Sequence, residues 1–267
     1  MRWAIGDIHG MRVSLEAIVH AIGSVDDDAR FYFVGDYVNR GPDSRRVIEF
    51  LLSIADRAAF VRGNHDDVLD LILNDAWEGG EDGVFDALTA CGWFLRHGLE
   101  DTLHSYGVDP DLIERDRRAP TPMLLRAIRE SFPDSHRNFI RALPTIVEEP
   151  GLFVAHAFWP PEERNDREHV FDRLAGDAEF THRVIWERWT PGQIIAQKPW
   201  SRPGFFGHTP VSNYPPSMRD GGNVPIVFQM ITLLDTGAAL SPAGRLSAVC
   251  VEDGRLIQVD RAGRVID

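Results

Sequence analysis

The sequence predicts an α/β fold, because short strands and helices alternate along its first part. Residues 2–5, 30–34 and 58–61 are compact runs rich in apolar, β-branched and aromatic residues, which is typical of buried strands. Between them, residues 11–22 and 44–54 space their apolar side chains with a helical period, and a Pro-Asp-Ser cap signal begins the second segment. Two successive strand–helix–strand units favour a parallel arrangement of the three strands.

The middle of the chain is dominated by helical patterns. We expect a helix to begin near Asp66 and to run to Asn74. The segment from about residue 76 to 143 is interpreted as a helical insertion beside the site, within a single domain covering residues 1–267. Residues 109–120 are expected to be a polar connector inside it. The helical patterns of the insertion cover residues 84–97, 121–131 and 135–143.

Short strands return after Gly151. The last three of them are separated by turn residues and predict an antiparallel meander, so the fold should contain mixed β-sheets flanked by helices. Residues 211–225 contain three prolines and a Gly-Gly pair, which predicts a loop. The expected strands are residues 152–155, 184–186, 204–206, 226–235, 246–251 and 256–260.

Composition limits the class of protein. The chain has 267 residues, 43% of them hydrophobic, which is enough to bury a sizeable core. Its formal net charge of -13 argues against general nucleic-acid binding, which needs clustered Lys and Arg. Cys91 and Cys250 match no metal or redox spacing, so we expect two buried free thiols in a reducing compartment. No apolar run approaches ~20 residues and no cationic leader pattern is present, so we expect a cytoplasmic location without membrane contact.

Possible metal ligands follow the expected strands at the points where those strands end. The motifs GDIHG at 6–10, GDYVNRG at 35–41 and GNHD at 63–66 each come after a run of strand-forming residues. His156 in LFVAHAF and His208 in GFFGHTP occupy the same kind of position. One Asp after Gly is typical of a turn or a helix cap, but caps do not predict five strand ends in this order.

The residue types of this set indicate a centre with two metal ions. Carboxylate and imidazole ligands without thiolate favour Mn²⁺, Fe or Zn, with Mn as the first expectation, over Ca²⁺ or structural zinc. Asp7 and His9 lie two residues apart, so in an extended segment they point the same way and can share one ion. Two ions ~3.5–4 Å apart, bridged by Asp36 and a hydroxide, would hydrolyse phosphate esters. The candidate ligands are Asp7, His9, Asp36, Asn64, His156 and His208.

With these motifs in this order, the chain resembles the calcineurin-like metallophosphoesterases. Within them it is most similar to the phosphoprotein phosphatase branch, which includes serine/threonine protein phosphatases and symmetrical diadenosine tetraphosphatases. The resemblance extends through RALPTIVE, VIWERW and LLDTGAAL and so covers most of the chain. It implies a four-layer αββα sandwich of two mixed β-sheets flanked by helices, with a helical insertion. It also implies hydrolysis of phosphomonoesters or phosphoanhydrides in small molecules, nucleotides or phosphoproteins, with a serine/threonine protein phosphatase as the alternative.

The resemblance also implies roles for individual residues. His65 would act as general acid beside the leaving oxygen, and Arg40 would bind the phosphate. Arg188 in VIWERW and Arg62 before GNHD are further phosphate-binding candidates, because a guanidinium can make two hydrogen bonds to phosphate oxygens. The ligands would divide into a first set, Asp7, His9 and Asp36, and a second set, Asp36, Asn64, His156 and His208.

One position departs from the phosphatase pattern. Protein phosphatases of this branch usually have Asp before the arginine of the second motif, where this chain has Asn39. An Asp would stabilise the imidazolium form of His65 and raise its pKa, whereas Asn cannot. A nucleotide-phosphate leaving group is a weaker base than a serine alkoxide and needs less protonation. Asn39 therefore favours phosphoanhydrides or small phosphoesters, although GDIHG at 6–10 points back towards the protein phosphatases.

Two other classes are less consistent with the sequence. A non-catalytic metal-binding scaffold is disfavoured because the ligand set and His65 are intact. A nuclease is disfavoured by the net charge of -13 and the lack of a basic stripe. The helical insertion around Trp93 should line the cleft. Trp159, Trp189 and Trp200 could stack on a base or fill the core, and we favour the core.

Overall fold

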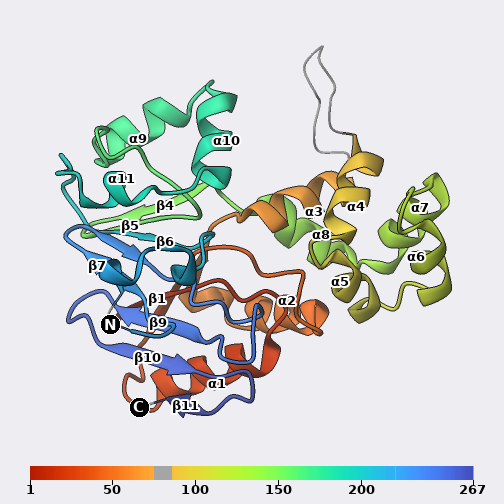
Figure 1. The fold of residues 1–267 in the computed structure, drawn as a ribbon, viewed down its shortest axis with the longest axis horizontal. Helices are drawn as coiled ribbons and strands as arrows, with labels where there is room; N and C mark the ends of the chain where they lie inside the picture. The colour runs from red at the N-terminus through yellow and green to blue at the C-terminus, as the bar shows by residue number, and fades with distance from the viewer. Residues whose placement is uncertain (75–85, 220, 267) are drawn as a thin grey trace.

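Two β-sheets lie face to face at the centre of the molecule, and helices cover their outer faces (Figure 1). The computed structural model describes residues 1–74, 86–219 and 221–266. This layering is the αββα arrangement that the sequence resemblance implies. Within the described ranges, no helix combines the length and the apolar character needed to cross a bilayer.

The first sheet has the strand order β11-β10-β9-β1-β2-β3. Its three predicted parallel strands are β1 (Arg2–Ile5), β2 (Arg30–Phe33) and β3 (Ala58–Phe60). Helices α1 (Arg12–Gly23) and α2 (Ser44–Ser53) connect them, as the apolar spacing predicted. On the other side of β1, the antiparallel strands are β9 (Leu246–Cys250), β10 (Leu256–Val259) and β11 (Val265–Ile266).

The second sheet has the strand order β4-β5-β6-β8-β7. Its strands are β4 (Ile146–Glu149), β5 (Leu152–Ala155), β6 (Gly204–Phe206), β7 (Ile226–Phe228) and β8 (Ile231–Leu233). Strands β5, β6 and β8 are parallel, and the two edge strands are antiparallel to their neighbours. Above this sheet in Figure 1 lie α9 (Arg167–Leu174), α10 (Ala178–Trp186) and α11 (Pro191–Ile195).

The apolar core is divided by the two sheets. Side chains such as Val34 and Val154 are buried in the cluster between the sheets. A second cluster joins β5 and β6 to α9, α10 and α11, and its aromatic side chains include Trp159, Trp189 and Trp200. These three tryptophans are at most 6% exposed, which confirms their prediction as core residues. Cys91 and Cys250 are buried free thiols, also as predicted.

The middle of the chain forms a group of helices on one side of the sheets (Figure 1). They are α3 (Asn64–Asn74), α4 (Ala87–Leu95), α5 (Leu99–Ser105), α6 (Pro110–Asp116), α7 (Pro122–Ser131) and α8 (Asp134–Ala142). The first residues of the predicted insertion, up to residue 85, lie outside the described residues. Helix α3 begins at Asn64, two residues before the predicted start, so the third motif opens a helix.

Two segments adopt helices where the sequence predicted something else. The expected connector at 109–120 contains α6, because Asp109 caps the helix by accepting from the Asp111 N–H and Pro110 fits its first turn. The expected strand at 184–186 is the end of α10, whose cap is Asp177. Three apolar residues cannot distinguish a short strand from the last turn of a helix.

The predicted strand at 226–235 is wrong in a different way. It is a hairpin of β7 and β8, with Gln229 at a positive φ of 51° in the turn. Both strands belong to the second sheet, so only β9 and β10 remain of the predicted three-stranded meander, and β11, which was not predicted, pairs with β10. The correction matters for the site, because β8 runs parallel to β6 and ends at the same edge.

Candidate active site

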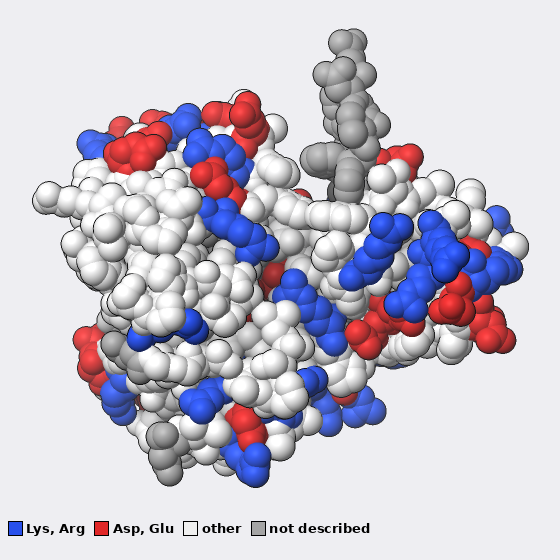
Figure 2. All heavy atoms as spheres, in the orientation of Figure 1, with Lys and Arg blue, Asp and Glu red and all other residues white. Residues whose placement is uncertain are grey.

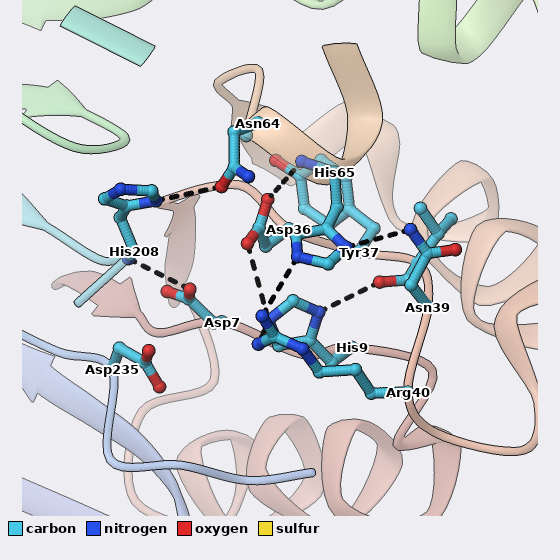
Figure 3. A network of polar contacts seen from close by, with 12 residues as sticks. Asp7, His9, Asp36, Tyr37, Asn39, Arg40, Asn64, His65, His208 and Asp235 are labelled. Atoms are coloured by element: carbon cyan, nitrogen blue, oxygen red, sulfur yellow. Dashed lines mark hydrogen bonds and ion pairs between the residues drawn. The ribbon is translucent and has the colours of Figure 1, made fainter. Parts of the chain in front are cut away.

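Six parallel strands, three from each sheet, deliver polar side chains to one edge of the sandwich. Because the carboxyl ends of parallel strands meet at the same edge, residues far apart in sequence become neighbours there. All six predicted ligands are brought together and are at most 8% exposed. Figure 3 shows most of this group around Asp36. In strand order the residues are Asp7 after β1, Asp36 after β2, Asn64 after β3, His156 after β5 and His208 after β6.

Asp36 is the centre of this arrangement. Among the described residues, two groups have ligand atoms that all lie within 4.8 Å of one another, and Asp36 is the member common to both. One group adds His9 and His65, and the other adds Asp7 and His156. His9 Nε2 lies 3.4 Å from Asp36 Oδ2, and His156 Nε2 lies 3.4 Å from Asp36 Oδ1. The two carboxylate oxygens therefore face different histidines.

Backbone carbonyls fix the orientation of the histidine rings. His9 donates from Nδ1 to the Val38 carbonyl at 2.9 Å, and His156 donates from Nδ1 to the Val34 carbonyl at 2.7 Å. Each bond leaves the Nε2 lone pair directed into the site, which is how proteins orient metal-ligating imidazoles. Burial, with Arg40 beside it, lowers the pKa of His9 to about 3, and burial lowers the pKa of His156. Both rings are therefore neutral at neutral pH, which is the form in which an imidazole can bind a metal ion.

Asn64 and His208 complete the second side of the site. Asn64 Oδ1 lies 3.1 Å from His156 Nε2 and 2.9 Å from His208 Nδ1. Burial lowers the pKa of His208 well below its usual range. Two neutral imidazole nitrogens and an amide oxygen thus converge next to Asp36, a donor set that suits Mn, Fe or Zn.

The ligands are held in backbone conformations that few residues adopt. Six non-glycine residues have a positive φ in the described ranges, and five of them belong to this site. Their φ values are 46° for His9, 56° for Asp36, 71° for Asn39, 69° for Arg40 and 67° for His208. Such conformations cost free energy and cluster at functional sites, where the surrounding structure enforces them.

Two glycines leave the space that the carboxylates occupy. A Cβ on Gly63 would lie 2.2 Å from Asp36 Oδ1, and a Cβ on Gly207 would lie 1.9 Å from Asp7 Oδ1. Both distances are far too short for a carbon and an oxygen that are not bonded to each other. Any larger residue at either position would therefore displace the carboxylate. The glycines of GNHD and GHTP are thus explained by close approach, not by turn geometry.

His65 lies beside this set with Asn39 behind it. Thr102 donates its hydroxyl to Asn39 Oδ1 at 2.9 Å, which turns Asn39 Nδ2 towards His65 Nδ1 at 2.8 Å. Burial lowers the pKa of His65 well below its usual range, so the ring is neutral. A neutral imidazole that accepts at Nδ1 carries its proton on Nε2. His65 therefore presents an N–H to the site.

The three candidate arginines have different positions. Arg40 points into the site, with its guanidinium 2.5 Å from His9 Nε2 and 3.0 Å from His65 Nε2. Arg188 is anchored at the rim by Thr209 Oγ1 at 3.2 Å. Arg62 does not join them. It binds Asp70 at 2.9 Å, Asp67 at 3.2 Å and backbone carbonyls of α8, which makes it a structural ion pair.

Asp235 belongs to the site although sequence reasoning missed it. It follows β8, the sixth parallel strand, and its side chain is 1% exposed. Oδ1 accepts from the Gly237 N–H at 2.9 Å, whereas Oδ2 has no hydrogen-bond partner in the described part of the chain. Burial raises the pKa of Asp235 to about 6, and the Asp235 charge adds to burial in raising the pKa of Asp7. The signal was present in LLDTG, an acid just beyond a strand, but residues 226–235 were predicted as one strand of an antiparallel meander, whereas β8 runs parallel to β6.

Buried carboxylate oxygens without hydrogen-bond partners indicate that cations fit this site. Asp7 Oδ1 and Asp235 Oδ2 are buried, have no partner among the described residues, and belong to carboxylates that lie near each other in Figure 3. Leaving buried carboxylate oxygens unpaired is costly, and a bound cation removes that cost. The donor set and these oxygens together fit divalent metal ions.

Comparisons with known proteins agree with this geometry. The family model described as calcineurin-like phosphoesterase matches residues 2–186. The symmetrical bis(5'-nucleosyl)-tetraphosphatase of Bordetella pertussis is 43% identical over 65 residues, 24% of either chain. The enzyme of the same name from Legionella pneumophila (strain Lens) is 37% identical over 90 residues, 33% of either chain. The matched segment thus spans no more than a third of these relatives.

Solved structures support the fold. A candidate diadenosine tetraphosphatase superposes with a TM-score of 0.55 at 22% identity, covering 97% of this chain and 92% of the other. A metallophosphoesterase from Sphaerobacter thermophilus gives a TM-score of 0.50 at 17% identity, covering 100% and 87%. With more than half of the sequence matched by the family model and this fold and site in place, the chain belongs to the calcineurin-like phosphoesterases, a family of metal-dependent phosphohydrolases.

Proposed function

We propose that this chain is a two-metal phosphohydrolase that prefers phosphoanhydrides, with dinucleoside polyphosphates as the leading substrate class. The observation that carries the proposal is the convergence of neutral imidazoles and carboxylates on Asp36, which two ligand groups share. Similarity to symmetrical bis(5'-nucleosyl)-tetraphosphatases supports the substrate class. The alternative function is that of a phosphomonoesterase, including a serine/threonine protein phosphatase, and the substrate panel below distinguishes the two.

The ligands would divide between two ions, with Mn²⁺ as the first expectation. Asp7 and His9 would hold one ion, and Asp36 would be shared by both. The ligands of the other ion would be Asn64, His156 and His208. When bound, the ions would activate a water molecule as nucleophile and neutralise charge on the phosphate oxygens. Asp235 would add a negative charge that favours the cation beside Asp7.

Arg40 and His65 would act on the substrate. The Arg40 guanidinium donates to the lone pair of His9 Nε2 but also faces the protonated Nε2 of His65, so only one of its two contacts is favourable and a phosphate oxygen would be a stronger partner. His65 would donate a hydrogen bond from Nε2 to the leaving oxygen, and it would transfer a proton only from its imidazolium form. Arg188, anchored at the rim by Thr209, would bind a phosphate further from the point of cleavage.

Asn39 supports anhydrides over alkyl esters. Its amide gives Nδ1 of His65 a hydrogen bond, which sets the tautomer but adds no negative charge to stabilise imidazolium. A neutral imidazole is a weak acid, so the reaction should be fastest when the leaving group is itself a weak base. Phosphate leaving groups of anhydrides meet that condition, and serine alkoxide does not.

A substrate panel with Mn²⁺ tests the proposal. We expect hydrolysis of diadenosine tetraphosphate to exceed that of a phosphoserine peptide by a large factor, and a chelator to abolish both. Asp36→Asn should abolish turnover on every substrate. Asp116→Asn changes a buried carboxylate of the insertion that binds Arg115 and Thr121, and it is the matched control. Chelator-resistant turnover, or faster hydrolysis of the phosphopeptide, would contradict the proposal.

A further inference from the structure

Three aromatic rings form a stack beside the candidate active site. The rings of His182 and Trp186 on α10 lie parallel, with centroids 5.5 Å apart and planes at 6°. Trp93 on α4 continues the stack at 6.4 Å from Trp186 and 19°. We call His182, Trp186 and Trp93 the aromatic stack. Trp93 is 43% exposed and His182 is also exposed, unlike the buried tryptophans of the core.

The aromatic stack is connected directly to the site. Phe94 lies 5.0 Å from His65, 5.3 Å from Trp93 and 6.3 Å from Trp186 between ring centroids. The Trp186 Nε1–H donates to Asp67 Oδ2 at 3.2 Å, and Asp67 lies one helical turn after Asn64 on α3. The stack is therefore one layer of side chains away from the residue expected to protonate the leaving group.

A groove of about 480 Å³ runs along the same wall, between α3 and the pair α9 and α10. Its apolar lining includes Leu174 and Ile185, and its polar lining includes Asp67, Thr181 and His182. A hollow with an acidic side chain at its floor is visible between the part of the molecule that carries α10 and the part that carries α4 (Figure 2). Flat walls with a few hydrogen-bonding groups are typical of sites for small ring systems.

We propose that the aromatic stack and this groove bind the nucleobase of a nucleotide whose phosphates lie at the candidate active site. The inference rests on the proposed function, because it assumes that the site holds phosphates. An aromatic face gains stacking energy from any base, and the exposed ring of His182, which also lines the groove, offers such a face. Asp67 can accept a hydrogen bond from an N–H of the base in addition to those it already accepts from Trp186 and Arg62.

The test compares a substrate that has bases with one that has none. Diadenosine tetraphosphate and inorganic tripolyphosphate both contain phosphoanhydride bonds, but only the first can stack. In His182→Ala and Trp186→Ala, we expect kcat/KM to fall about tenfold or more on diadenosine tetraphosphate relative to the change on tripolyphosphate. Trp186→Phe keeps a ring and should recover part of the loss. Phe171→Ala, at an aromatic side chain 52% exposed on α9, is the matched control and should leave the ratio unchanged.

Binding without turnover gives a second readout. AMP should quench the tryptophan fluorescence of the wild-type protein more strongly than ribose 5-phosphate does, and His182→Ala should reduce that difference. Equal losses on both substrates, or no loss on either, would overturn the inference and leave the stack as a contact that joins α4 to α10. If the wild-type protein cleaves neither substrate, the proposed function fails. The comparison of AMP with ribose 5-phosphate then still decides whether the stack binds a base.

Discussion

Replacing Asp235 with Asn tests two effects of this carboxylate. We expect its buried charge to lower the folding stability of the metal-free protein and to strengthen the binding of a metal ion. The side chain is 1% exposed, and its Oδ2 has no hydrogen-bond partner in the described residues. Burial raises its pKa from 3.8 to about 6. Asn has nearly the same shape as the protonated acid and cannot ionise, so the variant removes the charge while keeping the volume.

The size and sign of the effect follow from the pKa. Because the folded-state pKa lies above that of the unfolded chain, the protonated acid favours folding; this contribution is complete below pH 3.8 and is lost as the pH rises through about 6. Each pH unit between these values is worth about 1.4 kcal/mol, so the loss totals about 3 kcal/mol at neutral pH. The metal-free Asp235→Asn variant should therefore be about 3 kcal/mol more stable than wild type at about pH 7.5, and about 1 kcal/mol more stable near pH 4.5.

Urea unfolding followed by tryptophan fluorescence in the presence of a chelator measures this difference. Added Mn²⁺ should make the wild-type protein more stable than the variant. The wild-type carboxylate attracts the cation and the amide does not, so Mn²⁺ should stabilise wild type more than the variant. The control is Asp116→Asn. Hydrogen bonds from Arg115 and Thr121 lower the pKa of Asp116, so this substitution should destabilise the protein at neutral pH. Equal stability of Asp235→Asn and wild type, or a difference that does not change with pH, would refute the reasoning.

Three further substitutions test the remaining roles. Asp36→Asn should leave little Mn²⁺ bound after dialysis, because Asp36 is common to both ligand groups, and full metal content by elemental analysis would contradict a bridging role. His65→Ala should reduce kcat far more on alkyl phosphates than on aryl phosphates or anhydrides, with His136→Ala as a buried-histidine control; equal losses on all three would rule out the general acid. Asn39→Asp should raise turnover of alkyl phosphates relative to anhydrides, because a carboxylate beside Nδ1 favours imidazolium, and an unchanged ratio in steady-state assays would exclude this role.

The convergence of the candidate ligands could be predicted from the sequence because most of them follow the ends of parallel strands. Asp7, Asp36 and His156 each follow a short apolar run, and parallel strands bring such ends to one edge whatever the precise packing of the helices. The same rule failed for Asp235 because residues 226–235 look like one strand. The turn at Gln229 has no glycine to mark it, so the hairpin and the parallel direction of β8 could not be recognised.

The roles of the arginines depended on details that sequence spacing does not contain. Arg40 and Arg62 both stand beside a metal-ligand motif and look equally suited to phosphate. They differ because α3 begins at Asn64, which turns Asp67 and Asp70 back towards Arg62 and satisfies its guanidinium. No carboxylate contacts the Arg40 guanidinium in the described structure, and it faces two imidazoles. Which arginine is available to an anion is thus decided by helix geometry.

Asp66, the last residue of the GNHD motif, supports the backbone of the second motif. Asp66 accepts hydrogen bonds from the backbone N–H groups of Asp36 at 2.8 Å, Tyr37 at 3.1 Å and Gly63 at 3.0 Å. These bonds help to hold Asp36 at its positive φ of 56°, a conformation that is uncommon for non-glycine residues. The Asp66 side chain contacts the backbone of Asp36, and the backbone N–H of His65 donates to Asp36 Oδ1 at 2.9 Å. The acid after His65 therefore supports the backbone of Asp36 from the first turn of α3.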